Sequence, residues 1–286
     1  MYARASDFWP TYWGGCGAPI IQDLTPSPIR SHIFQGCDSR STLHSKSGEK
    51  LAQARKRVYQ KLAEAIPGEV DGKCRWARHE FHDNQYASES SNRFFPTPER
   101  LQLFDTIIDR ILEASLPSRY IVELGTGPGY LAARLLKAIP EVTYEGVDFS
   151  HSMFELAAAR LGSYDSRVQF TQADLTTEDW GGEISRPVGA IVETWTLHDL
   201  GGEMNTRNVY QSCRRLLPEG GMLLNGDFVK PDGAKHEYEP GRFLISRHLK
   251  ILQEVGFREA QCLIMLEEEL ENPTAANNYD CLQAVA

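Results

Sequence analysis

The sequence predicts an α/β fold, in which a mostly parallel sheet carries helices on both faces. Three observations support this prediction. From residue 120 onward, short apolar strand patterns alternate with helical patterns, which is typical of parallel sheets. A turn rich in glycine joins the first strand of this series to the first helix. The last two strand patterns have no helical pattern between them, so we expect one of these strands to be antiparallel.

Each element in this series follows from its own pattern. We expect strands in the short apolar stretches, and helices where apolar residues recur every three or four positions. The expected strands are residues 120–125, 142–148, 167–174, 189–195, 222–229, 259–266 and 279–286, and the expected helices are residues 129–140, 152–162, 208–221 and 239–256.

The N-terminal third of the chain is less regular. Residues 1–45 combine Pro, Gly and Ser with several aromatics, and we expect a loop-like arm that docks on a surface. A helix is expected over residues 48–66, where Pro67 and Gly68 end the pattern. We therefore divide the chain into an N-terminal arm and helical lid at 1–97 and a core at 98–286.

A second helix is expected over residues 98–115, at the start of the core. Thr97 can act as its N-cap, and Pro98 suits the first turn. The spacing of apolar residues predicts a buried face on this helix. That face consists of Leu101, Phe104, Ile108, Ile111 and Leu112.

Composition limits the classes of function. The chain has 286 residues, 41% of them hydrophobic, which is enough for a sizeable core. Its net charge of −9 argues against bulk binding of nucleic acid. None of the six cysteines forms a C-x-x-C pair, so we expect no zinc site and a reducing, cytoplasmic location. We find no signal-peptide pattern and no apolar run long enough to cross a membrane.

The stretch "VELGTGPGY", residues 122–130, is the strongest indication of a ligand site. Glycines at 125, 127 and 129 follow an apolar strand, and a helix begins at once. Glycine permits a sharp turn and a close approach of a ligand, and the N-terminus of a helix favours anionic or polar groups. A tight strand-to-helix turn is the alternative interpretation of the glycines alone.

Acidic residues end the next two strands. Asp148 follows the second strand, 21 residues after Gly127, and Asp174 follows the third. An acid at about this distance suits the two hydroxyls of a ribose, because a carboxylate accepts from both. A carboxylate at Asp174 can accept from an exocyclic adenine amine. The three strand ends together therefore predict a nucleoside site.

The glycine spacing differs from the dinucleotide fingerprint, because Tyr130 stands where the third glycine of that fingerprint would be. The spacing, together with Glu123, resembles the class I S-adenosylmethionine-dependent methyltransferases, of the type that acts on small molecules. Further matching segments are "LLPEGGMLL" before the fifth strand and "HLKILQEVGF" before the last pair. The resemblance covers about residues 98–286. It implies a Rossmann-like seven-stranded sheet whose last strand is antiparallel.

The resemblance also implies that S-adenosyl-L-methionine is the cofactor. The glycine loop would pass close to its amino-acid and ribose parts, Glu123 would hold the ammonium end, and Asp148 would bind the ribose. Phe149 would lie against the adenine, and Asp174 and Leu175 would meet its edge. The full set of expected cofactor residues is Glu123, Gly125, Thr126, Gly127, Gly129, Asp148, Phe149, Asp174, Leu175 and Glu193.

The methyl acceptor should lie beyond the fourth strand, where the chain reads "ETWTLHDLGG". Methyltransferases of nucleic-acid amines usually carry prolines here, and this chain has none, which argues against a base amine as acceptor. His198 can act as a general base or can simply shape the turn. Trp195 can form a wall of the substrate pocket or pack in the core. Glu193 can orient an amine or serve a structural hydrogen bond.

The predicted lid offers further pocket residues. Tyr86 is our second candidate for a catalytic role, and Asn92 for a substrate contact. His79 and His82 have a spacing of three, but no carboxylate partner accompanies them, so we expect surface histidines and no metal.

The sequence thus predicts methyl transfer to an O or N atom of a small, apolar or aromatic metabolite, in secondary metabolism. Three alternatives remain open: a C-methyltransferase, a protein methyltransferase, and a non-catalytic protein that binds the cofactor. We expect a small-molecule substrate and neither a nucleic acid nor a membrane as partner. The oligomeric state stays open, with a homodimer as one option.

Overall fold

The computed structural model describes residues 80–94, 96–176, 179–184, 187–238, 240–274 and 276–286. The chain divides into two units, residues 1–50 and 51–286, and every described residue belongs to the second unit. The predicted arm at 1–45, the predicted helix at 48–66 and His79 lie outside the described residues. These assignments, and the domain boundary after residue 97, stay predictions.

Among the described residues, seven strands form one sheet in the order β3-β2-β1-β4-β5-β7-β6. The first five strands run parallel to one another, and β7 is antiparallel to both of its neighbours, β5 and β6. The predicted mostly parallel sheet with an antiparallel last strand is therefore confirmed. The strands are β1 (Tyr120–Leu124), β2 (Thr143–Asp148), β3 (Val168–Gln172), β4 (Ala190–Thr194), β5 (Met222–Gly226), β6 (Arg258–Leu266) and β7 (Tyr279–Val285).

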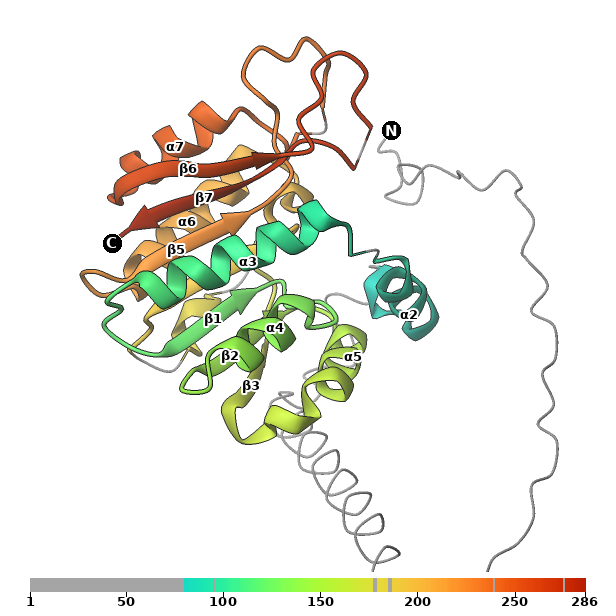
Figure 1. The fold of residues 1–286 in the computed structure, drawn as a ribbon, viewed down its shortest axis with the longest axis vertical. Coiled ribbons are helices and arrows are strands. Elements are labelled where there is room, and N and C mark those ends of the chain that lie inside the picture. The colour runs from blue at the N-terminus through green and yellow to red at the C-terminus, as the bar shows by residue number, and fades with distance from the viewer. Residues whose placement is uncertain (1–79, 95, 177–178, 185–186, 239, 275) are drawn as a thin grey trace, which may run out of the picture. The chain divides into compact units, whose positions relative to one another are not determined.

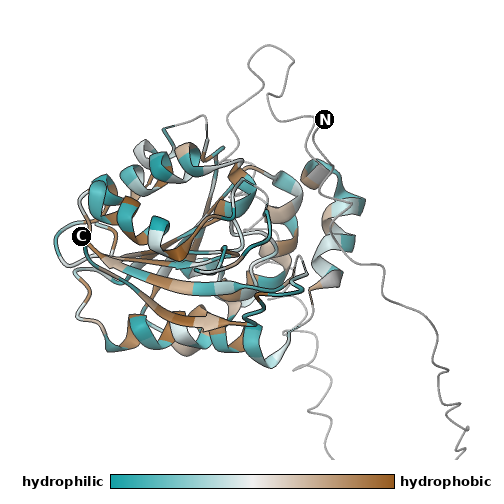
Figure 2. Ribbon diagram, turned by 90° about the horizontal axis from the view of Figure 1, so that it is seen from above, coloured by the Kyte–Doolittle hydropathy of each residue, from teal (hydrophilic) through white to brown (hydrophobic). Residues whose placement is uncertain are grey.

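Helices cover both faces of this sheet. Figure 1 shows α3, α4 and α5 on the near face and α6 and α7 on the far face, and two separate apolar clusters fill the space between sheet and helices. Figure 2 shows hydrophobic residues concentrated along the strands between these layers. The helices are α2 (Asn84–Arg93), α3 (Pro98–Glu113), α4 (Tyr130–Ala138), α5 (His151–Leu161), α6 (Glu203–Leu216) and α7 (Ile245–Glu254), with short 3₁₀ helices at η2 (Glu80–His82), η3 (Gly162–Arg167), η4 (Trp180–Gly182) and η5 (Leu197–Leu200).

Helix α3 confirms the predicted N-cap and corrects the predicted buried face of this helix. The Thr97 side chain accepts a hydrogen bond from the Arg100 backbone N–H, as expected of an N-cap. Leu112, however, is 47% exposed, so its assignment to the apolar face was wrong. The face has shifted because the sheet lies on the side of the helix that carries positions 103 and 107. The buried residues are Leu103, Phe104, Ile107, Ile108 and Ile111.

Helix α7 begins six residues later than the sequence predicts. Two residues of the segment 240–244 instead make backbone contacts with Lys230, after β5. The Lys230 backbone N–H donates to the Phe243 carbonyl, and Lys230 and Leu244 form a β-bridge. A side chain at Gly241 would come within 1.7 Å of the His198 carbonyl oxygen, so this loop passes directly against the turn that carries His198.

The topology brings the ends of the central strands together. In a parallel sheet the carboxyl ends of β1, β2, β4 and β5 lie along one edge, and the loops that follow them share that edge. Cys213 and Cys281 are buried free thiols. Among the described helices, none has the length and apolar character needed to cross a bilayer.

Candidate active site

The glycine loop between β1 and α4 is sharply turned. Gly125, Gly127 and Gly129 all have positive φ, at 63°, 51° and 77°. A side chain at Gly125 would lie only 2.1 Å from Thr196 Oγ1, in the loop that follows β4. Glycine at 125 is therefore needed both for the backbone conformation and because the two loops approach each other closely. This approach joins the predicted cofactor side to the predicted acceptor side.

Glu123 lies beneath the glycine loop in a buried polar cluster. The Tyr144 hydroxyl donates to Glu123 Oε2 at 2.6 Å and is hydrogen-bonded to Thr126 Oγ1 at 3.0 Å. Burial raises the pKa of Glu123 to about 8, against the effect of the Tyr144 hydrogen bond, and Asp148 raises it further. A cation placed beside Glu123 would favour its ionised form, because an opposite charge stabilises a carboxylate.

Asp148 is buried at the end of β2 and holds the two loops around it. Its Oδ2 accepts from the Gly127 backbone N–H at 2.8 Å, and its Oδ1 accepts from the Ser150 backbone N–H at 2.9 Å. Burial raises its pKa to about 6, although these backbone hydrogen bonds oppose the rise. A carboxylate has about four acceptor positions, so not all of them are taken by these backbone groups and a ligand hydroxyl can still donate to Asp148.

The end of β3 provides the third acidic group. Asp174 Oδ1 accepts from the backbone N–H and the hydroxyl of Thr176, and Leu175 is buried beside it. Phe149, next to Asp148, is half-buried and meets the rings of Phe81 and His82 edge to face. The three strand ends thus carry the predicted acids at one edge of the sheet.

His198 lies in η5, after β4, and is paired with a buried carboxylate. Its Nδ1 is 2.7 Å from Asp227 Oδ1, and its backbone N–H donates to Asp227 Oδ2 at 2.8 Å. Asp227 directly follows β5 and is 1% exposed, whereas the His198 side chain is 12% exposed. A carboxylate on Nδ1 fixes the ring and its tautomer, so Nε2 becomes the nitrogen that can accept a proton.

The charge environment of His198 favours its protonated form. Burial lowers the pKa of the imidazole, but Asp227 and Asp199 raise it, and the balance is a pKa of about 9. Arg242 opposes the rise. A positive group bound nearby would lower this pKa again, because like charges disfavour the imidazolium.

Trp195 connects β4 to this turn in an unusual conformation. Its φ of 53° is uncommon for a bulky residue, and its backbone N–H donates to the Gly226 carbonyl at 2.9 Å. Such conformations persist only where the surroundings fix them, and they cluster at functional sites. The Trp195 ring is surrounded by four aromatic rings, those of Phe94, Phe104, Phe228 and Tyr279, at centroid distances of 5.5–6.4 Å.

Glu193 is fully buried below this turn. Its Oε2 accepts from the Thr196 backbone N–H at 3.3 Å. Burial raises its pKa, and two further buried carboxyls, Asp227 and Asp280, raise it more. The contacts of Glu193 are with the turn of its own strand, and its predicted cofactor contact stays a prediction.

The two predicted lid residues lie on α2. The Tyr86 ring meets Phe81 edge to face at 5.3 Å, so it lies beside the aromatic cluster around Phe149. Asn92 is exposed near the end of the helix. Their proposed catalytic and substrate-binding roles stay predictions.

Two residues of the site have no counterpart in the sequence analysis. Asp227 lies in the middle of "NGDFV", directly after β5. An acid directly after the strand next to β4 was the signal that could have found it. Tyr144 lies within β2 and is fully buried; only the pairing of β1 with β2 places its hydroxyl at Glu123.

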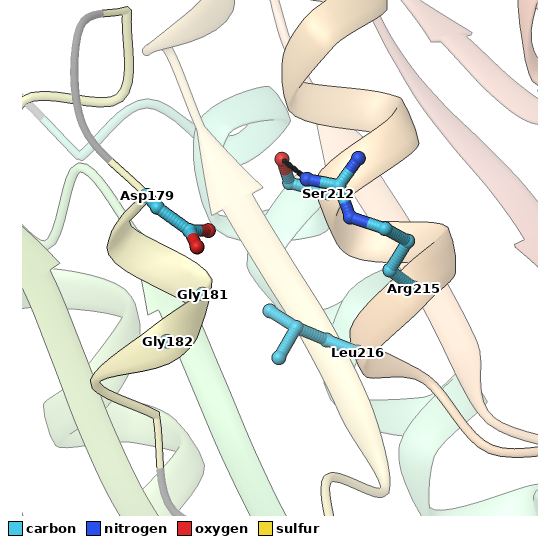
Figure 3. Close-up of a pocket in the computed structure, with 6 residues that line it drawn as sticks. All are labelled: Asp179, Gly181, Gly182, Ser212, Arg215 and Leu216. Atoms are coloured by element: carbon cyan, nitrogen blue, oxygen red, sulfur yellow. Dashed lines mark hydrogen bonds between the residues drawn. The ribbon is translucent and has the colours of Figure 1, made fainter.

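A separate small pocket lies between η4 and α6. Figure 3 shows Asp179 on one side of it and Ser212 and Arg215 on the other, and its volume is about 140 Å³. None of the residues predicted for the site lines it. Within the described part of the chain, no group of His, Cys, Asp or Glu side chains is arranged to hold a metal ion.

Comparisons with known proteins agree with this geometry. Residues 122–223 match a family model described as a methyltransferase domain. An O-methyltransferase of Cercospora nicotianae, CTB2, is 26% identical over 140 residues, which are 49% of this chain and 30% of that protein. The malonyl-[acyl-carrier protein] O-methyltransferase of Halalkalibacterium halodurans is 35% identical over 75 residues, 26% of each chain. The matches therefore span less than a third of either relative.

Solved structures share the fold at low sequence identity. An O-methyltransferase family protein from Burkholderia thailandensis has a TM-score of 0.53 at 15% identity, covering 82% of this chain and 71% of that one. The phosphoethanolamine N-methyltransferase 2 of Haemonchus contortus, in complex with S-adenosyl-L-methionine, has a TM-score of 0.56 at 14% identity. The match covers 77% of this chain and 61% of that one. The CurJ carbon methyltransferase has a TM-score of 0.53 at 16% identity, and the match covers 86% of this chain and 69% of that one.

The sheet order, the glycine loop with its three acids and the family match agree with one another. Residues 122–223 match a methyltransferase domain, and the fold is shared with solved S-adenosylmethionine-dependent methyltransferases. Its similar structures include O-, N- and C-methyltransferases, so the fold alone does not select the acceptor atom.

Proposed function

We propose that this protein transfers the methyl group of S-adenosyl-L-methionine to an O or N atom of a small, apolar or aromatic metabolite. The observation that carries the proposal is the buried His198–Asp227 pair, in a loop that lies against the glycine loop. The pair supplies a proton acceptor beside the cofactor site, which suits acceptors that lose a proton from oxygen or nitrogen.

The cofactor side fits a charged nucleoside. The remaining acceptor capacity of Asp148 suits a ribose hydroxyl, and the half-buried Phe149 offers an aromatic surface for adenine. Glu123 is buried, and burial raises its pKa. This carboxyl suits an ammonium group, because the positive charge would favour the ionised form of Glu123. The bound cofactor supplies an already activated methyl group, so the residues of this chain mainly position the acceptor and exclude water.

The acceptor side follows from the residues after β4. Asp227 holds the His198 ring so that Nε2 faces away from the carboxylate, and this nitrogen takes the proton released by the acceptor. The positive charge of the cofactor lowers the pKa of His198 and so favours the neutral, basic imidazole. Trp195 is partly buried and packs against the core rings of Phe104, Phe228 and Tyr279, and its remaining aromatic surface favours an apolar or aromatic acceptor.

We also propose a reducing, cytoplasmic setting, which the buried free thiols of Cys213 and Cys281 support. The substrate is a small molecule in this proposal, and the secondary metabolism suggested by the sequence fits an aromatic acceptor pocket. The oligomeric state stays open.

Calorimetry with S-adenosylmethionine tests the cofactor part of the proposal. We expect binding by the wild-type chain and a loss of at least about tenfold in affinity for Asp148→Ala, because two backbone N–H groups and the ribose lose their acceptor. Asp232→Ala, at an exposed acid outside the site, serves as the matched control. No binding at millimolar cofactor, or equal binding by Asp148→Ala, would contradict the proposal.

A further inference from the structure

A tyrosine of β2 holds the buried glutamate near the end of β1. Glu123 lies opposite Gly146 in the register of the two strands, and Tyr144 lies two positions before Gly146. Residues two positions apart in a strand point to the same face of the sheet, so the side chains of Tyr144 and Glu123 share a face. The Tyr144 hydroxyl therefore reaches Glu123 Oε2 along that face and donates to it at 2.6 Å.

A glycine and a threonine keep the tyrosine hydroxyl in this place. A side chain at Gly146 would come within 2.3 Å of Thr126 Oγ1, so Gly146 leaves the space that Thr126 fills. Because the Tyr144 hydroxyl donates its own proton to Glu123, Thr126 Oγ1 is the donor in the 3.0 Å hydrogen bond to Tyr144. Thr126 belongs to the glycine loop, so the tyrosine connects β2, this loop and the buried acid.

One oxygen of Glu123 is left for a ligand. Oε2 accepts from Tyr144, whereas Oε1 makes no hydrogen bond with any residue that the structure describes. The titratable groups that act on Glu123 within the described ranges are Tyr144 and Asp148, both on β2. On β4 the residue opposite Glu123 is Val192, and the buried side chains of α3 and α4, which cover this face, are apolar.

A buried carboxyl beside a second acid favours its neutral form. Burial raises the pKa of Glu123 to about 8; the Tyr144 hydrogen bond opposes this rise, and Asp148 adds to it. Near pH 7, Glu123 is therefore mainly protonated in the protein without ligand. An ammonium group beside Oε1 reverses this preference, because an opposite charge stabilises the carboxylate.

We propose that Tyr144 is a positioning residue for the ammonium end of the cofactor, and that Glu123 releases a proton when this ammonium group binds. The Glu123 O–H bond breaks, its proton passes to water, and the carboxylate pairs with an ammonium group that keeps all of its own protons. This inference rests on the proposed function, because it concerns the same cofactor. Its consequence is that nucleosides with an amino-acid tail bind more tightly as the pH rises, whereas nucleosides without this tail gain nothing from Glu123.

Calorimetry with two nucleosides tests the proton release and needs no acceptor. S-adenosylhomocysteine carries the ammonium group, and 5′-methylthioadenosine does not. The heat of binding in two buffers of different ionisation enthalpy counts the protons released. At pH 7 we expect S-adenosylhomocysteine to release close to one proton more than 5′-methylthioadenosine. Its affinity relative to 5′-methylthioadenosine should rise about fivefold between pH 7 and pH 8. Asp148 and His198 meet both nucleosides, so the difference isolates the amino-acid end.

A pair of tyrosine variants tests the role of Tyr144. Tyr144→Phe removes the hydrogen bond that favours the ionised Glu123, so the affinity for S-adenosylhomocysteine at pH 7 should fall about tenfold. The pH at which this affinity rises should increase, and binding of 5′-methylthioadenosine should change by less than about twofold. Tyr120→Phe is the matched control, because the Tyr120 hydroxyl donates to Glu145 on the opposite face of the same two strands. This control should leave both affinities and the proton count unchanged.

Two further measurements complete the test. Glu123→Gln, which has no carboxyl proton to release, should bind S-adenosylhomocysteine without the additional proton. Thermal unfolding of each variant shows whether it is folded.

The outcomes separate the two proposals. If the wild-type chain binds neither nucleoside, the proposed function fails and this inference fails with it. If the wild-type chain binds both, but both release equal numbers of protons, or Tyr144→Phe behaves like Tyr120→Phe, the inference alone is overturned.

Discussion

The pairing of His198 with Asp227 makes a quantitative prediction about proton binding. We consider Asp227→Asn, which keeps the shape of the side chain and removes its charge. In the wild-type protein His198 has a pKa of about 9, because Asp227 and Asp199 outweigh the burial that lowers it. In the variant burial dominates, and we expect the pKa of His198 to fall below the ordinary value of 6.5.

The size of the effect follows from the geometry. Asp227 is 1% exposed and 2.7 Å from Nδ1, whereas Asp199 is 64% exposed, 3.4 Å from Nε2 and screened by water. The rise in the pKa of His198 corresponds to roughly 3 kcal/mol in favour of the imidazolium. Because the folded-state pKa lies above the unfolded one, this stabilisation is complete below pH 6.5 and is lost as the pH rises through about 9.

Nuclear magnetic resonance measures this pKa directly and needs no substrate. The ring proton of His198 is assigned by its absence in His198→Gln and followed from pH 5 to pH 10. We expect a midpoint near 9 in the wild-type chain and below 6.5 in Asp227→Asn.

A wild-type midpoint at or below 6.5 would refute this reasoning. It would mean that burial of the imidazole, which lowers the pKa of His198, outweighs the effect of Asp227 and Asp199. The pair would then be a structural hydrogen bond rather than a base and its orienting carboxylate.

Three further predictions concern stability and are measured by urea unfolding. Gly125→Ala should lower the free energy of unfolding by about 1–3 kcal/mol, because φ at this position is 63° and the added Cβ would lie 2.1 Å from Thr196 Oγ1. Adding Thr196→Ala to this variant should recover part of the loss, and strictly additive losses would contradict a steric clash between the two positions. Asp280→Asn should stabilise the protein by about 1–2 kcal/mol at pH 8, since both carboxyl oxygens are buried without a hydrogen-bond partner in the described structure. Because burial raises the pKa of this acid, the gain in stability should vanish below pH 4. A loss of stability at pH 8 would show that the charge of Asp280 is needed. Ile107→Ala should lower the free energy of unfolding by about 2–4 kcal/mol, and Leu112→Ala by less than about 0.5 kcal/mol, because Ile107 is buried and Leu112 is exposed. Equal losses would mean that α3 packs on the sheet through a different face.

The sheet and the cofactor edge could be predicted because their signals are local. The glycines at 125, 127 and 129, and the acids Asp148 and Asp174, each lie at the end of a strand or within a few residues after it. In a parallel sheet this position alone brings them to a common edge. Little knowledge of packing is needed for that inference.

The side-chain partners within the site depend on which strands are neighbours in the sheet. The order of the strands could not be predicted from the sequence. Asp227 reaches His198 because β5 lies beside β4, with Thr194 opposite Gly226. Tyr144 reaches Glu123 because β2 lies beside β1.

The errors in the helices have a similar cause. The spacing of apolar residues on α3 admits more than one face, and only the position of the sheet selects Ile107 over Leu112. The late start of α7 follows from the bridge between Lys230 and Leu244, which draws residues 240–244 out of the helical pattern.

The most direct test of the account is the transfer of an isotope-labelled methyl group. The chain is incubated with labelled S-adenosylmethionine and an extract of its source cells, and the products are separated into macromolecules and small metabolites. We expect label in the small-metabolite fraction, lost with Asp148→Ala and strongly reduced with His198→Ala near neutral pH. Label confined to macromolecules, or equal labelling by wild-type protein and His198→Ala at every pH, would contradict a small-molecule methyltransferase that uses His198 as its base.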